Sequence, residues 1–361
     1  MPTLRFFVLV AALIALLTPG AAAQTYPGRP IRLVVPFGAG GVADISSRIV
    51  AEKLGDQLGQ RFVIDNQPGA GGIAAGRSVL SAPRDGYTLA LFTNGTAISA
   101  SLFNLPFDPL KDFAPISTMG YFDCLFATNA KAPYGSLQDF LKAAREKPGT
   151  LNVGTVARGS TQNLTAELFK TTAGVDFVIV PFRTTPEAVI ALLRDDIQMV
   201  IDFYAGLKPG LSDNSTRAIA WSAMKRSPAL PDVPTVQEAG VPGFNVTSWN
   251  AFYAPTEVPG NVIETLNSGL RTALADPEVK RKLLDLGIDS RPSTPDELDA
   301  QMRADIKKWS EVIARGPASR SSSRDRHEAV SSPERGEHTQ PNGRDHECTN
   351  TAECDGRHGS Q

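Results

Sequence analysis

Apolar residues in this chain recur in short runs that alternate with helically spaced positions, and the first such unit spans residues 31–58. The run Ile-Arg-Leu-Val-Val at residues 31–35 predicts a strand, and Pro-Phe-Gly-Ala-Gly-Gly at residues 36–41 predicts a turn. Four apolar residues then follow at helical spacing: Ile45, Ile49, Leu54 and Leu58. Because a helix N-terminus presents unpaired backbone N–H groups and a partial positive charge, this strand–turn–helix unit predicts a site for a carboxylate.

The next stretch repeats the alternation. Strands are expected at residues 62–65 and 87–92, separated by a glycine-rich loop, a short helix to about Ser81 and a turn at 83–86. This βαβαβ order predicts a mostly parallel sheet that binds ligands beyond the carboxyl ends of its strands. Thr93-Asn94-Gly95-Thr96 lies at one such end, where the Asn94 amide is either a ligand contact or part of a plain turn.

A second α/β unit begins near Asp123. A capping-box pattern at residues 136–139 predicts a helix to Lys147, and a strand at 151–154 runs into a polar, glycine-containing loop before another helix. A strand at 177–181 precedes a turn and a helix with Pro186 at its first position, and a strand at 197–201 ends at Asp202. The strand, small-residue turn and helix N-terminus of the opening unit therefore recur.

The chain then returns toward its start. Residues 245–253 have strand character, and helices are expected at 259–275, 277–286 and 294–314. The last helix carries an apolar stripe, which consists of Leu298, Met302, Ile306, Trp309 and Ile313.

These patterns predict an α/β protein of two lobes. Lobe 1 comprises residues 24–122 plus 250–314, and lobe 2 comprises residues 123–249. Two chain crossings and a cleft between lobes suit hinge closure around a ligand.

The N-terminus has the pattern of an export signal. Arg5 precedes an apolar run at residues 6–17 and a small-residue region that ends in an Ala-x-Ala pattern, which predicts cleavage near Ala23 and a periplasmic location. The apolar run is too short for the alternative, a membrane anchor. Residues 1–23 are therefore expected to be a signal peptide.

The C-terminal residues 315–361 contain no Leu, Ile, Met, Phe, Tyr or Trp, so they cannot bury enough apolar surface to fold. They hold all four histidines and two of the three cysteines of the chain, but the spacings match no zinc pattern. We expect a disordered tail, either native or produced by a shifted reading frame.

The composition limits which classes of function the chain can have. The chain has 36 Lys and Arg against 38 Asp and Glu, a balance that gives no reason to expect a nucleic-acid partner. Residues 24–314 contain no histidine and a single cysteine, Cys124, in an apolar stretch where a buried structural thiol is expected. A Ser-His-Asp or Cys-His site cannot be built there. Carboxylate or lysine chemistry is the catalytic alternative that remains, but no pair of acids stands out among the charged residues.

A rival interpretation is an NAD-dependent oxidoreductase. Residues 38–43 fit the pattern G-x-G-x-x-G/A, and Asp65 lies at about the distance expected for a ribose-binding acid. The export signal without a twin-arginine pair, the lack of histidine and Pro36 before the turn all argue against it.

The content and order of five further segments are informative about the family of the chain. They are Asn66-Gln67-Pro68-Gly69-Ala70-Gly71-Gly72, residues 83–89, residues 108–116, Val180-Pro181-Phe182-Arg183 and residues 231–235. With residues 26–41, Asp44 and Arg48, they resemble the Bug family, the periplasmic substrate-binding proteins of tripartite tricarboxylate transporters. The resemblance implies the fold of type II periplasmic binding proteins, a ligand cleft between lobes, no cofactor and no metal. It also implies a small organic acid and integral membrane transporter subunits as partners, and we expect a monomer.

The resemblance also implies where the ligand binds. The matching positions in the first glycine-rich turn are Phe37, Gly38, Ala39, Gly40 and Gly41, and those in the facing loop are Thr155, Arg158, Gly159, Ser160, Thr161 and Gln162. Arg183, Thr184 and Asp202 follow on the next two strand ends; Thr184 and the pair Asp195-Asp196 depart from the small residues usual in the family.

Three of the candidate residues have a structural alternative. Asp44 contacts a ligand amine or caps its helix, Arg158 pairs with a distal carboxylate or is simply exposed, and Phe37 covers the ligand or fills the core. The ligand itself stays open among tricarboxylates, dicarboxylates, acidic amino acids and aromatic acids. A protein that senses such a ligand and feeds a signalling system is the alternative to transport.

Overall fold

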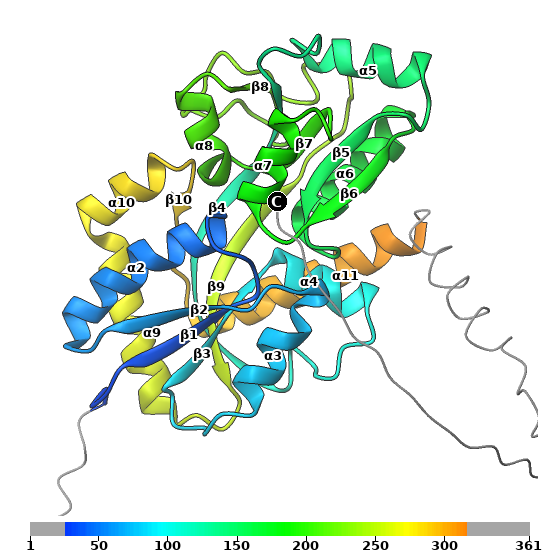
Figure 1. The fold of residues 1–361 in the computed structure, drawn as a ribbon. Coiled ribbons are helices and arrows are strands. Elements are labelled where there is room, and N and C mark those ends of the chain that lie inside the picture. Colours follow the sequence, from blue (N-terminus) through cyan, green and yellow to red (C-terminus); the bar gives the residue numbers. More distant parts are fainter. Residues whose placement is uncertain (1–25, 316–361) are drawn as a thin grey trace, which may run out of the picture. The chain divides into compact units, whose positions relative to one another are not determined.

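The computed structural model describes residues 26–315, and the predicted signal peptide and the tail beyond Arg315 lie outside this range. Within it, ten strands form one mixed sheet in the order β2-β1-β3-β9-β4-β7-β5-β6, and β8 and β10 pair with β4 (Figure 1). Helices lie on both faces of this sheet, as the alternating pattern predicts. None of the helices in this range is long and apolar enough to cross a bilayer.

The first half of the sheet contains the predicted βαβαβ unit. Strand β1 (Ile31–Val35) pairs in parallel with β2 (Phe62–Asn66) and β3 (Thr88–Thr93). The intervening helices are α2 (Val42–Leu58) and α3 (Ile73–Leu80), the latter after the short helix η1 (Ala70–Gly72). Helix α4 (Asn94–Leu102) follows β3 directly, with Thr93 as its cap, so the strand end is a helix start rather than a plain turn.

The second half repeats this arrangement. Strand β5 (Asn152–Val156) pairs in parallel with β6 (Val178–Phe182) and β7 (Met199–Phe203). The helices are α5 (Leu137–Glu146), α6 (Thr161–Ala173), α7 (Thr185–Leu193) and α8 (Tyr204–Ser212). The capping box at Ser136 is confirmed. Helix α8 and strand β8 (Thr216–Trp221) were not predicted, and Pro209 inside α8 explains part of that failure.

Two long strands connect the halves. The first part of β4 (Phe113–Asn129) pairs with β9 (Thr247–Pro255) and with the short β10 (Asp289–Ser290), and its last part pairs with β7 and β8. Residue 123, the expected boundary between lobes, therefore lies inside a continuous strand. A hinge between the halves would bend β4 and β9 instead of a loop.

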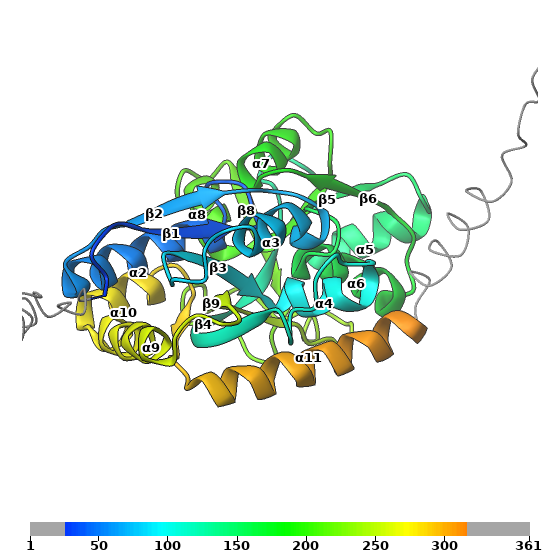
Figure 2. The same cartoon turned by 90° about the horizontal axis from the view of Figure 1, so that it is seen from below.

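Three C-terminal helices pack on the first half. They are α9 (Gly260–Ala275), α10 (Pro277–Leu284) and α11 (Pro295–Arg315), and α11 runs along β4 and α4 (Figure 2). The predicted stripe of α11 is buried except for Ile306, which is half-buried. The Trp309 indole Nε1 donates to Asn94 Oδ1 at 2.8 Å, so α11 also fixes the start of α4.

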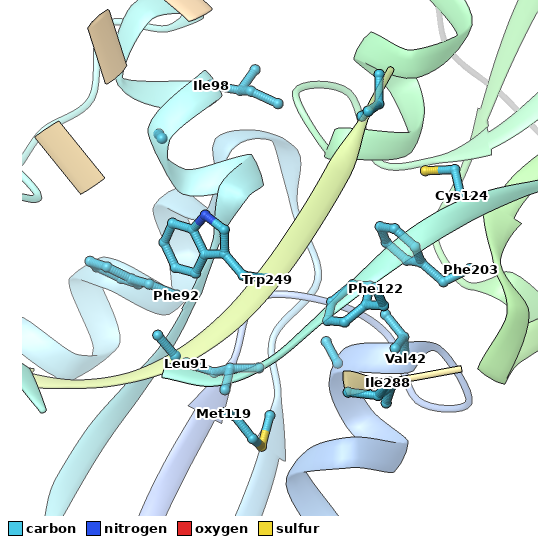
Figure 3. Close-up of a cluster of buried hydrophobic side chains, with 14 of the residues drawn as sticks. Val42, Leu91, Phe92, Ile98, Met119, Phe122, Cys124, Phe203, Trp249 and Ile288 are labelled. Atoms are coloured by element: carbon cyan, nitrogen blue, oxygen red, sulfur yellow. The ribbon is translucent and has the colours of Figure 1, made fainter. Parts of the chain in front are cut away.

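Buried aromatic side chains continue from the first half into the second. The rings of Phe122 on β4 and Phe203 on β7 meet edge to face with centroids 4.6 Å apart, near Val42 of α2 (Figure 3). Cys124 is buried beside them, as predicted for a structural thiol. This packing holds the start of α2 against the end of β7.

Candidate functional site

A small cavity lies where the carboxyl ends of β1, β5, β6 and β7 face one another. Its walls come from both halves: Phe37, Gly38, Gly41, Val42, Ala43, Thr93, Val156, Thr161, Gln162, Arg183, Thr184, Thr185, Phe203, Ser248 and Asn250. Its volume is about 20 Å³, which is room for one water molecule. We call this space the central cavity.

The N-termini of four helices surround the central cavity. Its walls include the first two residues of α2, Thr93 at the cap of α4, the first two residues of α6 and the capping segment of α7. Each of these ends carries backbone N–H groups without a helical partner and a partial positive charge. The arrangement suits an anion, and the strand–turn–helix pattern is what places these helix starts together.

Hydrogen bonds from neighbouring side chains fix the glycine-rich turn before α2. Gly40 has a positive φ of 86°, and its N–H donates to Asp44 Oδ2 at 3.0 Å, while Asn66 Nδ2 donates to the Phe37 carbonyl at 3.0 Å. Gly41 caps α2 without any side-chain hydrogen bond. The first N–H groups of α2 are therefore left for another partner.

Asp44 is part of this hydrogen-bond network. It is buried, and its Oδ1 lies 2.8 Å from Arg48 Nη2. Burial by itself raises the pKa of the carboxyl, but the hydrogen bonds from Arg48 and Gly40 outweigh it and hold the pKa below its usual value. Both carboxylate oxygens are engaged and Asp44 does not line the cavity, so its contacts favour the structural alternative over a ligand amine.

Of the segment from Thr155 to Gln162, only Val156 at its start and the first two residues of α6 at its end line the cavity. Thr161 and Gln162 line it, whereas Thr155 is buried beneath the loop and Ser160 caps α6 by accepting from the Asn163 N–H at 3.1 Å. Arg158 is exposed. It lines, together with Gly159, Ser160 and Phe37, a second small space on the other side of Phe37.

Asp202 supports the wall instead of forming it. Its buried carboxylate accepts from Gln162 Nε2 at 2.9 Å and from Thr185 Oγ1 at 2.7 Å. Burial raises the pKa of this carboxyl, against the effect of those hydrogen bonds. Asp202 thus orients two residues that line the cavity.

Arg183 and Thr184 both line the cavity. Arg183 is exposed and is the only charged residue in the cavity wall among residues 26–315. Thr184 caps α7 by accepting from the Glu187 N–H at 3.2 Å, and its methyl group lies against Gly38 of the opposite half. The Phe37 side chain is half-buried and packs on the core, as its structural alternative states, and it also lines the cavity; that it covers a ligand stays a prediction.

The central cavity thus brings together seven of the candidate residues, namely Phe37, Gly38, Gly41, Thr161, Gln162, Arg183 and Thr184. Ala39, Gly40, Asp44, Asn94, Thr155, Arg158, Gly159, Ser160 and Asp202 lie around it without forming its wall. Asn94 donates to Thr161 Oγ1 at 3.3 Å, so it ties α4 to α6.

Sequence reasoning missed the contribution of β9. Ser248 and Asn250 line the cavity, and Asn250 Nδ2 donates to Ser46 Oγ of α2 at 3.1 Å. No local signal marks these residues, because they reach the cavity only through the pairing of β9 with β3 and β4. Thr185 and Phe203 are next to predicted positions and could have been included by extending each strand end by one residue.

The oxidoreductase interpretation depended on Asp65. In the structure, the Asp65 carboxylate accepts from Arg32 Nε at 2.9 Å and from Gln67 Nε2 at 2.9 Å, and it lies away from the central cavity. These contacts give the acid a structural partner on each side.

Comparison with known proteins agrees with the geometry. Residues 46–316 match the model of the tripartite tricarboxylate transporter family receptor. A Pseudomonas sp. (strain P51) relative, described as a UPF0065 protein in the tcbD-tcbE intergenic region, is 32% identical; the alignment covers 85% of this chain and 93% of that protein.

Solved structures give the same result. The R. palustris protein Rpa4515, solved with adipate, is 32% identical and has a TM-score of 0.77, with coverage of 80% of this chain and 97% of that one. MatC from Rhodopseudomonas palustris, solved with bound malate, is also 32% identical and has a TM-score of 0.75, with coverage of 80% and 100%. The fold, the anion-suited cavity and these matches together place the chain in the tripartite tricarboxylate transporter receptor family, as a solute-binding protein and not an enzyme.

Proposed function

We propose that this protein captures a small organic acid in the periplasm and delivers it to the membrane subunits of a tripartite tricarboxylate transporter. The observation that carries the proposal is the convergence of four helix N-termini on one cavity where, in the part of the chain that the structure describes, Arg183 is the only charged lining residue. Such a cavity favours a carboxylate through backbone N–H groups and dipoles. The adipate and malate structures of the two relatives support the same ligand chemistry.

Binding would require the halves to separate. A dicarboxylate does not fit in a volume of about 20 Å³. The turn at Gly38 belongs to the first half and Thr184 to the second, so bending at β4 and β9 would admit the ligand; reclosure would bring these two residues back into contact beside a cavity that the ligand keeps larger than the present one. The surrounding polar groups would then act on the ligand carboxylate in a space from which most water is excluded.

The lining also favours some acids over others. Apart from Arg183, the described residues that form the wall have neutral side chains, and the nearby carboxylates of Asp44 and Asp202 are engaged with protein donors. A ligand ammonium group would therefore find no free acidic partner here. We propose simple carboxylic acids in preference to amino acids.

Isothermal titration calorimetry with malate, adipate, citrate, aspartate and benzoate tests this function. We expect at least one acid without an amino group to bind. Arg183→Ala should weaken it about 10- to 150-fold, since a hydrogen bond to a charged group contributes about 1.5–3 kcal/mol. Arg194→Ala, at the exposed far end of α7, is the matched control and should bind like the wild type. Failure of every acid to bind would refute the proposal.

Delivery needs a separate test. Labelled ligand should accumulate in cells that carry a transporter of this family only when the wild-type chain is exported with it. The Arg183→Ala variant should then reduce uptake in proportion to its loss of binding. Binding in vitro without any uptake would favour the sensing alternative.

A further inference from the structure

The two functional groups of Thr184 have separate positions. Its hydroxyl oxygen accepts from the Glu187 N–H at 3.2 Å and so caps α7. Its methyl points the other way, toward the glycine-rich turn: a Cβ atom built on Gly38 would lie only 2.3 Å from Thr184 Cγ2. The methyl therefore touches the opposite half of the protein while the hydroxyl holds its own helix.

Helix capping does not explain the methyl. Serine caps a helix at least as well as threonine, because the capping interaction uses only the side-chain oxygen. Other capping positions in this chain are indeed serine, for example Ser136 of α5 and Ser160 of α6. The methyl of Thr184 is an addition that α7 itself does not need.

The methyl is large on the scale of the central cavity. Thr184 lines that cavity, whose volume is about 20 Å³. A methyl group is about as large as a water molecule, so its removal would free space comparable to the whole present cavity. The Thr184 methyl is thus well placed to limit what fits between the two halves.

We propose that the methyl group of Thr184 determines how long a ligand carbon chain the site accepts. The inference rests on the proposed function, because it concerns the same cavity and the same class of ligand. With the methyl present, the space between Gly38 and α7 is filled and the site favours the shorter members of a dicarboxylate series. Without it, one further methylene of the ligand fits in the same place while the halves close equally far.

Two substitutions separate the methyl from the hydroxyl. Thr184→Ser removes the methyl and keeps the cap, whereas Thr184→Val keeps a methyl at the Cγ2 position and removes the cap. The probes are the unbranched dicarboxylates succinate, glutarate and adipate, and calorimetry measures the ratio of the Kd values of glutarate and succinate, which differ by one methylene, for each variant. Thermal unfolding and circular dichroism report whether each variant is folded.

We expect Thr184→Ser to shift this ratio toward glutarate by about tenfold, since one methylene in an apolar pocket changes affinity by about 10- to 200-fold. Thr184→Val should keep the wild-type ratio although it loses the cap and melts at a lower temperature. An unchanged ratio in Thr184→Ser, a shift toward succinate, or an equal shift in Thr184→Val would overturn the proposal. Unchanged ratios with intact binding would leave the proposed function standing. A wild-type protein that binds none of the three diacids would overturn this proposal alone, and the proposed function would fall only if malate, citrate, aspartate and benzoate also failed to bind.

Discussion

The contact between Gly38 and Thr184 makes a strong prediction about Gly38→Ala. The φ of Gly38 is not in the left-handed region, so alanine meets no backbone strain there. Its new Cβ would nevertheless lie 2.3 Å from Thr184 Cγ2 and 3.0 Å from the Arg183 carbonyl oxygen. Overpacking of this kind typically costs about 1–3 kcal/mol.

The cost should appear mainly in ligand binding. Gly38 and Thr184 belong to opposite halves, so a protein without ligand can relieve the clash by a small separation of the halves. A ligand that needs both halves in contact cannot use this route. A penalty of about 1–3 kcal/mol on the closed arrangement corresponds to a loss of affinity of about 5- to 150-fold.

Calorimetry with an acid that binds the wild-type protein measures this loss, and thermal unfolding without ligand should change little by comparison. The double variant Gly38→Ala, Thr184→Gly removes the Cγ2 and Cβ atoms of Thr184 and should recover most of the affinity. Gly260→Ala, whose Cβ would meet open space, is the control for a change of glycine to alanine. Wild-type affinity in Gly38→Ala, or no recovery in the double variant, would refute the reasoning.

Three further predictions concern buried groups. Burial raises the pKa of Asp202, so this residue stabilises the fold most below the ordinary aspartate pKa of about 4, and that contribution is lost as pH rises through the raised pKa. Urea unfolding should therefore show that the free energy of unfolding of the wild type increases relative to that of Asp202→Asn as pH falls from 7 to 4. A difference that stays constant with pH would contradict this. Burial likewise raises the pKa of the Cys124 thiol, so Cys124 should resist alkylation by iodoacetamide in the folded protein and react in urea. Mass spectrometry of the peptide that contains Cys124 measures this, and rapid labelling of the folded protein would exclude a buried thiol. Trp309→Phe should lower the free energy of unfolding by about 1–3 kcal/mol because Asn94 Oδ1 loses its donor. Lys307→Ala, an exposed position of α11, should change the free energy of unfolding little in the same denaturation assay; equal effects would argue against the Asn94 hydrogen bond.

Most helices and strands of the fold depend on interactions between residues that are close in the sequence, so local sequence patterns predicted most of them. The capping boxes at Ser136 and Thr294 marked the starts of α5 and α11 because a side-chain oxygen three residues from its backbone partner acts without help from the rest of the chain. The strand–turn–helix unit at residues 31–58 is recognisable for the same reason. Helix α8 and strand β8 were not predicted; for α8 the reason is Pro209, which interrupts the helical pattern.

By itself, the sequence determined that several helix starts follow strand ends and that no histidine or second cysteine is available in residues 24–314. Only the tertiary structure decided which of these helix starts share one cavity. It also decided that Asp44 and Asp202 hydrogen-bond to residues of the cavity region without lining the cavity, and that Asn250 lines it because β9 pairs with β3 at Thr93. The physical reason is distance along the chain: a cap or a turn depends on neighbours within a few residues. The contact of Gly38 with Thr184, in contrast, exists only after two separately formed units have packed against each other.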